Sequence, residues 1–499
     1  MHDHGCSSNG PCPVPPHPKR LEREMLSANK TTFRRLSSDV PITTPFGLGD
    51  GVIFPPEDFP PGVPKAFMKR AAALQPPLRG PLNVLIVLTS YKDMAIRPDA
   101  AEYFNTLFFS HGKVKTGSVT EYYEEVSGGR VSITGSIFGP YILPETAEYY
   151  SRDGWGFRNA AKSTAPENPN TQTMAGHALD ALLKDKPSID LGPFDNNGRA
   201  QGTVDAFIVV HAGIGGEIDG SNPKRDIWSV KWDLKKQRTV GKSNTKVYGF
   251  LTIPEDAKVG VSAHEIGHLV FGWPDLYDNS QRTRGVGKWC LMSGGTWGSI
   301  QGTEEGTVPC HPSAWCKVQQ GWVDLQASKG VKAVLLSDVK GAAVVKGIKA
   351  SASSKADNTG VVYRLWTNGD ANSKEYFLIE SRKRYGFDRS LPGEGLLVWH
   401  IDDNVEENDF SKSDHLKVTL LNADFKSKGL PVSHKEYKDG EGCPFPGLTK
   451  NQTFNATSSP NSHSHSNLDT SVSVTNISDD SRNGVVRMDI SVQPPRAKL

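Results

Sequence analysis

The sequence predicts an α+β fold, and three observations lead to this prediction. Continuous apolar runs bounded by turn residues, PLNVLIVLTS at 81–90 and VDAFIVVHAG at 204–213, are typical of strands buried on both faces. Segments with helical spacing of apolar residues lie between them: DAAEYFNTLFFSH, SVTEYYEEVS and AGHALDALLKD. Beyond about residue 325, short β-rich runs separated by Gly, Asn, Asp and Ser replace the helix signals. A mixed α/β region is therefore expected to precede a β-rich region.

These changes in composition and residue pattern divide the chain of 499 residues into three parts. Residues 1–80 are rich in Pro and Gly and read as an extended arm or pro-segment. Residues 81–325 form the α/β domain, and residues 326–499 form a β-rich, sandwich-like domain. The strands expected there are KAVLLSDV, GVVYRLW, EYFLIESR, GLLVWHI, LKVTLLNA, TSVSVTNIS and VVRMDISV.

Composition excludes several classes of function and favours an extracellular protein. A net charge of +2 gives no electrostatic reason to expect nucleic acid as a partner, and no apolar run reaches the 18 residues of a membrane span. No signal peptide is visible, but an even number of cysteines and clustered glycosylation sequons favour secretion, and we expect a monomer. The cysteines are Cys6, Cys12, Cys290, Cys310, Cys316 and Cys443, and the sequons begin at Asn29, Asn451, Asn455 and Asn476.

The stretch VSAHEIGHLVFGWPDLYD at 261–278 carries the clearest chemical signal. On a helix, His264 and His268 lie one turn apart on one face, where two imidazoles can bind one zinc ion. Glu265 lies beside them and is suited to take a proton from a water and pass it to a leaving amine. A buried helix with incidental polar residues is the alternative, but it would bear a large desolvation cost for three such side chains. The stretch therefore predicts a catalytic zinc site.

Catalytic zinc usually has three protein ligands and one water, so a third ligand is needed. Gly272 permits a sharp turn at the helix end, after which Asp275 can return toward the metal. Asp278 is a nearby competitor, and Glu304 or Glu305 would serve if the third ligand is distant in sequence. The residues alone leave this choice open, with Asp275 favoured.

Several motifs together resemble the immune inhibitor A family of secreted zinc metalloproteases: HEIGHLVFGWPDLYD, WCLMSGGTWG, HPSAWCKVQQGW, EYFLIESRKRYGFDRSLPGEGLLVWHID and CPFPG, with GSVTEYYEEVSGGRVSITGSIFGPY upstream. The resemblance spans roughly residues 80–480. It implies a zincin or metzincin-like catalytic domain, with His264 and His268 as ligands, Glu265 as general base and Met292 as the Met-turn. The family more often reads HExxHxxGxxD, whereas Phe271 here adds one residue before Gly272, which would rotate the residues after it by about 100° if the chain stays helical.

Two further metal or regulatory possibilities arise at other segments. The family often has a calcium loop where this chain reads FDNNGRAQGTVD, but Arg199 replaces an acidic ligand, so a plain turn formed by Asp195, Asn197 and Asp205 is favoured over calcium. A thiolate from Cys12 could occupy the open zinc position, although a local disulfide between Cys6 and Cys12 is the simpler expectation.

The leading functional hypothesis is a zinc-dependent endopeptidase that hydrolyses peptide bonds of proteins. A non-catalytic extracellular zinc-containing binding protein, acting through its C-terminal β domain, is the alternative. A serine hydrolase has no support because the chain contains no G-x-S-x-G. Of the other histidines, His311 is the candidate transition-state donor, whereas His400 and the SHSHS stretch at 462–466 favour structural or solvated roles.

Overall fold

The computed structural model describes residues 12–20, 23, 78–157, 169–196, 202–240, 243–280, 282–323, 343–349, 362–367, 370, 372–424, 440, 442–480 and 485–492. The chain divides into two compact units. The first unit comprises residues 1–123 and 131–274, and the second comprises residues 124–130 and 275–499.

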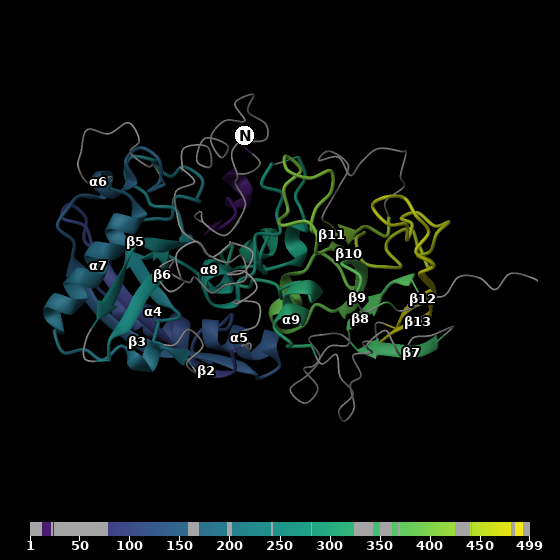
Figure 1. Ribbon diagram of the computed structural model, residues 1–499, viewed down its shortest axis with the longest axis horizontal. Coiled ribbons are helices and arrows are strands. Elements are labelled where there is room, and N and C mark those ends of the chain that lie inside the picture. The colour runs from purple at the N-terminus through teal and green to yellow at the C-terminus, as the bar shows by residue number, and fades with distance from the viewer. Residues whose placement is uncertain are drawn as a thin grey trace, which may run out of the picture. The chain divides into compact units, whose positions relative to one another are not determined.

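A six-stranded mixed sheet of order β1-β5-β6-β4-β2-β3 forms the centre of the first unit (Figure 1). Neighbouring strands pair in parallel from β3 through β2 and β4 to β6, whereas β5 and β1 add antiparallel at one edge. β4 is buried at every residue and β2 from Val84 onward, as their continuous apolar sequences predict. The strands are β1 Cys12–Pro13, β2 Gly80–Ser90, β3 Val131–Ile142, β4 Phe207–His211, β5 Val230–Val240 and β6 Thr245–Pro254.

Helices connect β2 to β3 and β3 to β4, and helices pack on the sheet. α7 contacts β2, β3, β5 and β6, α4 contacts β3, and α8 contacts β6, β5 and β1. The side chain of Asn170 caps α7 by accepting a hydrogen bond from the Thr173 N–H, which fixes where this helix begins. The helices are α4 Ala100–Phe109, α5 Val119–Ser127, α6 Ala147–Ser151, α7 Thr171–Asp185, α8 Val259–Phe271 and α9 Ala314–Gln319.

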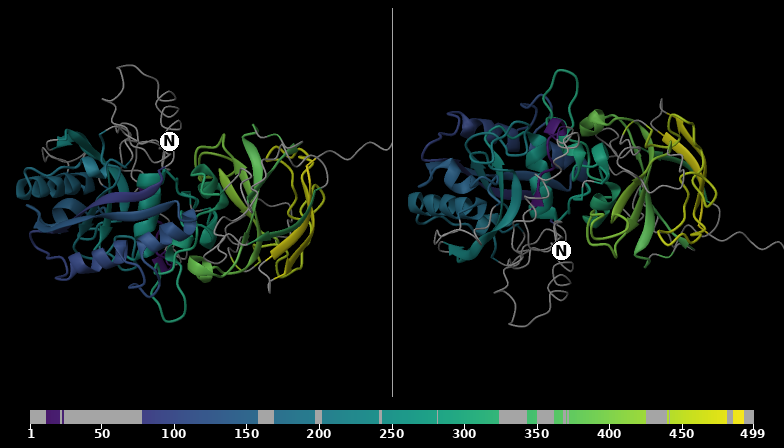
Figure 2. Two further views of the ribbon diagram at one scale, coloured as in Figure 1. Left: turned by 90° about the horizontal axis from the view of Figure 1, so that it is seen from below. Right: turned by 90° about the horizontal axis from the view of Figure 1, so that it is seen from above.

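Two antiparallel sheets occur in the second unit (Figure 2). One has the order β11-β10-β9-β8 and the other has the order β12-β13-β7. Buried side chains from both sheets and from the loops beside them form one hydrophobic cluster, which includes Phe377, Val398, Phe454, Val474 and Val486. The strands are β7 Ala343–Lys349, β8 Val362–Leu365, β9 Glu375–Arg382, β10 Gly395–Asp402, β11 Val418–Leu421, β12 Ser473–Asp480 and β13 Val485–Ser491.

The observed elements match most of the expected ones. All three helices expected between the first two buried strands are present, as are six of the seven β-rich runs beyond residue 325. β7 was not expected, because apolar and polar residues do not alternate clearly in its sequence AVVKGIK. The run at 332–339 and most of the arm at 1–80 lie outside the described residues. Among the described residues, no helix has the length and hydropathy that crossing a membrane requires.

Candidate metal centre

Helix α8 places the two predicted histidine ligands. Its thirteen residues are all buried, because its apolar side chains pack on the sheet of the first unit. His264 and His268 are 0% and 2% exposed, and their rings lie 4.5 Å apart between centroids. The spacing of four residues therefore produces the pair that the sequence predicts.

The two imidazoles are oriented toward a common point. Their Nε2 atoms lie 2.9 Å apart, close to the separation of about 3.3 Å expected for two nitrogens bound to one tetrahedral zinc ion. Nδ1 of His268 lies 2.6 Å from the Trp273 carbonyl oxygen. Because a carbonyl only accepts, Nδ1 carries the proton and Nε2 keeps the lone pair that a metal needs.

The chain turn after α8 brings in a carboxylate. Gly272 adopts a left-handed conformation with φ 71°, which glycine reaches without a side-chain clash, and the Trp273 N–H donates to the Gly267 carbonyl. One ligand atom each from His264, His268 and Asp275 then lies within 4.8 Å of the others. All three residues belong to one continuous segment, so local backbone conformation is sufficient to bring them together.

Phe271 remains helical and does not prevent this arrangement. It is the last residue of α8, and its ring lies 5.2 Å from the rings of Tyr123 and Trp273, measured between centroids. The added residue thus packs in the core, and the left-handed Gly272 redirects the chain immediately afterwards.

The competing carboxylates occupy different environments. Asp278 accepts hydrogen bonds from the N–H and hydroxyl groups of Ser280 and Thr283, and from the Phe410 N–H. These bonds use its oxygens to hold a loop, so Asp278 is poorly suited to bind a metal. Glu304 is exposed, and neither it nor Glu305 belongs to a metal-ligand cluster among the described residues.

Two further predicted residues lie beside this segment. Glu265 is fully buried next to His264 on α8. Met292 is also fully buried, and its carbonyl oxygen accepts a 2.7 Å hydrogen bond from the N–H of Leu276, the residue after Asp275. The loop that carries Met292 is therefore tied to the chain that carries the carboxylate.

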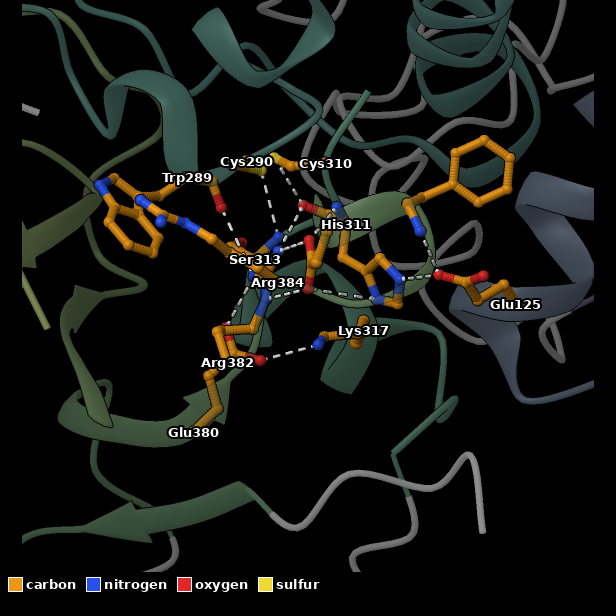
Figure 3. Close-up of polar contacts among 12 residues, drawn as sticks. Glu125, Trp289, Cys290, Cys310, His311, Ser313, Lys317, Glu380, Arg382 and Arg384 are labelled. Carbon is orange, nitrogen blue, oxygen red and sulfur yellow. Dashed lines mark hydrogen bonds and ion pairs between the residues drawn. The ribbon is translucent and has the colours of Figure 1, made fainter. Parts of the chain in front are cut away.

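A buried charged network in the second unit was missed by sequence reasoning (Figure 3). His311 is 1% exposed, and its Nε2 lies 2.8 Å from Glu125. Its backbone N–H donates to Asp388, which also accepts two hydrogen bonds from Arg382. Arg382 contacts Glu380 as well, at 3.2 Å. This arrangement favours a structural role for His311 over that of a transition-state donor, and no local sequence signal connects residues so far apart.

Among the residues that the structure describes, the arm contributes no ligand to the centre, and the segment at 194–205 has the contacts of the plain turn that was favoured over a calcium loop. Cys12 is disulfide-bonded and pairs with Lys231 in the sheet, so it offers no thiolate for zinc. Asp195 and Asp205 accept hydrogen bonds from the N–H groups of Gly202 and Asn196, as in a plain turn. Asn197 and Arg199 lie outside the described residues.

Comparisons with known proteins point to the same region. Residues 89–323 match the catalytic domain of the immune inhibitor A peptidase M6 family. Over 224 residues the chain is 31% identical to the pre-pro-metalloprotease PrtV of Vibrio cholerae, a match that covers 40% of this chain and 23% of PrtV. It is also 31% identical over 214 residues to immune inhibitor A of Bacillus thuringiensis, covering 38% of this chain and 30% of that protein. The matched region thus spans less than a third of the length of either relative.

Proposed function

Since residues 89–323 match the catalytic domain of the immune inhibitor A peptidase M6 family, we propose that the chain is a zinc-dependent endopeptidase acting on proteins. The convergence of His264, His268 and Asp275 carries the proposal, because two imidazoles and one carboxylate are a donor set suited to zinc. The name of the relative PrtV, which describes a metalloprotease, supports the same reaction class.

The proposed chemistry gives each side chain a distinct task. A bound zinc ion would polarise the scissile carbonyl and lower the pKa of the attacking water. His264, His268 and Asp275 would hold the ion, and the Trp273 carbonyl would fix the orientation of the His268 ring. Glu265 would accept the proton of the water and deliver it to the leaving amine as general base and then general acid.

The alternative of a non-catalytic zinc-containing binding protein is less well supported. A structural zinc site usually has four protein ligands, whereas the cluster formed by α8 and the turn after it has three among the residues that the structure describes. A buried glutamate beside the first histidine also has a purpose in hydrolysis and none in a structural site.

The proposal extends to the organisation of the chain. We retain an arm at 1–80, a metzincin-like catalytic domain at 81–325 with Met292 as its Met-turn, and a β-sandwich at 326–499. The shared hydrophobic cluster of the two C-terminal sheets supports the sandwich. Secretion and a monomeric state belong to the same proposal. Calcium binding at 194–205 does not, because Asp195 and Asp205 accept hydrogen bonds there as in a plain turn.

Zinc content and cleavage of casein, measured together on matched variants, test the proposal. Glu265→Gln should retain zinc and lose activity by about 100-fold to 10,000-fold, because only proton transfer is removed. The exposed Glu304→Gln is the control and should cleave normally. o-Phenanthroline should inhibit the wild type, and added zinc should restore cleavage. Normal cleavage by Glu265→Gln would refute the assigned role.

A further inference from the structure

A second group of metal-binding side chains lies in the second unit, at one end of the sheet β11-β10-β9-β8. One ligand atom each from Glu375, His400 and His465 lies within 4.8 Å of the others. Glu375 begins β9, His400 lies in β10, and His465 comes from the loop between β11 and β12. Sheet register accounts for part of the arrangement, because His400 lies opposite Phe377, two residues along β9 from Glu375.

The imidazoles in this group are stacked rather than dispersed in solvent. The ring of His465 lies between the rings of His400 and His415, with centroid distances of 3.9 Å and 3.7 Å and interplanar angles of 4° and 16°. His400 is buried, and its other neighbour is the ring of Phe377 at 4.4 Å. The SHSHS stretch therefore does not form only a solvated loop, since His465 packs on the sheet.

The hydrogen bonds distinguish candidate ligands from supporting residues. Both nitrogens of His415 are engaged by carboxylates, Nε2 with Asp402 at 3.0 Å and Nδ1 with Asp414 at 2.6 Å. His415 therefore covers one face of the stack without offering a nitrogen. In contrast, Nε2 of His465 is buried and has no hydrogen-bond partner among the described residues. A buried polar atom of this kind is costly unless something satisfies it.

The carboxylate of Glu375 is already positioned by the other two residues. Its Oε1 atom lies 2.9 Å from Nε2 of His400 and accepts a 2.6 Å hydrogen bond from the backbone N–H of His465. A divalent ion would replace the proton shared between His400 and Glu375. Two imidazoles with one carboxylate favour zinc, copper or nickel over calcium or magnesium, which prefer oxygen ligands.

We propose that Glu375, His400 and His465 form a second site for a divalent transition-metal ion of the zinc class, which fastens the loop around His465 to the strands β9 and β10. The proposal is independent of the peptidase function, because it uses none of the residues on α8.

Zinc stoichiometry of the chelator-stripped full chain tests the proposal. The wild type should take up two zinc ions, and His465→Gln should take up one. His463→Gln is the matched control, because His463 lies two residues away in the same loop, its ring Nδ1 lies 3.0 Å from Asn467, and its loss should leave two ions bound. His264→Gln should lose the other ion and keep this one. Zinc should raise the melting temperature of His264→Gln but not that of a double variant that also carries His465→Gln.

The outcomes separate the two sites. The second site would be overturned if His465→Gln and the wild type took up the same number of zinc ions. It would also be overturned if the wild type took up a single zinc ion and His264→Gln took up none. If His465→Gln fails to fold by circular dichroism, Glu375→Gln replaces it, with the same expected loss of one ion. Retention of both ions by His264→Gln would instead count against the proposed peptidase centre.

Discussion

Replacing Arg382 with methionine tests how the buried charged network stabilises the second unit. The Arg382 side chain is 0% exposed and donates two hydrogen bonds to Asp388, at 2.6 Å and 2.5 Å. Methionine fills similar space but leaves the buried Asp388 carboxylate without its cation. Breaking a buried pair in this way costs about 3–5 kcal/mol. Glu380 should contribute less to this cost, because it keeps its 2.7 Å ion pair with Lys317.

The free energy of unfolding should also change with pH in a way that depends on Arg382. Burial raises the pKa of Asp388, but attraction to Arg382 and His311, with their hydrogen bonds, outweighs burial and holds this pKa at about 2. Its folded-state pKa is thus below the unfolded value of about 3.9, so its contribution is present above about pH 4 and is lost as the pH falls toward 2. In Arg382→Met the attraction and the hydrogen bonds from Arg382 are lost, and we expect burial to outweigh the remaining contribution of His311, so that the direction of the pKa shift reverses. The variant should then regain stability relative to wild type as the pH falls from 7 to 4.

Urea unfolding followed by tryptophan fluorescence measures both effects. For a unit of this size, with a slope of about 2–3 kcal/mol per M, the loss corresponds to a midpoint lower by about 1–2 M at pH 7. The control Arg384→Met changes an exposed arginine two residues away and should shift the midpoint by less than about 0.3 M. Equal shifts for both variants, or a shift that does not change with pH, would refute this account of the network.

Three further predictions concern single residues. Asp275→Asn should weaken zinc binding by at least about 100-fold in a competition titration. Asp278→Asn should keep zinc but lower the melting temperature, because it disturbs the hydrogen bonds of its loop. The reverse pattern would make Asp278 the metal ligand and Asp275 the loop residue. Burial raises the pKa of Asp233 to about 7. The contribution of Asp233 to the free energy of unfolding is therefore fully present below about pH 4 and is lost as the pH rises through 7. Asp233→Asn should therefore raise the urea midpoint increasingly from pH 4 to pH 8, and no gain at pH 8 would contradict this. Gly386→Ala should lower the free energy of unfolding in urea by about 1–3 kcal/mol, because φ at Gly386 is 57° and the new Cβ would lie 2.2 Å from Oε1 of Glu125. An unchanged urea midpoint would exclude this strain.

Much of the fold was predictable because its signals are local. The runs EYFLIESR and GLLVWHI correspond to β9 Glu375–Arg382 and β10 Gly395–Asp402 almost residue for residue. This agreement arises because the apolar and β-branched residues of a strand, and the turn residues at its two ends, are neighbours in the chain. Pairing and sheet order were not predictable, because they depend on contacts between distant segments. The buried network shows the same limit, since Glu125 and Phe387, whose backbone N–H donates to the Glu125 carboxylate, are 262 residues apart.

The sequence by itself determined the pair of histidines at 264 and 268 and the glutamate between them, because helical geometry repeats every 3.6 residues and requires no distant partner. The tertiary structure was needed to favour Asp275 over Asp278 as the proposed third ligand, because the turn at the left-handed Gly272 brings the first carboxylate near the histidines and loop hydrogen bonds occupy the second. It also brought His465 onto His400, 65 residues earlier in the chain, where neither histidine alone had suggested a ligand. Local periodicity can place donors on one element, but only packing brings donors from separate elements to one point.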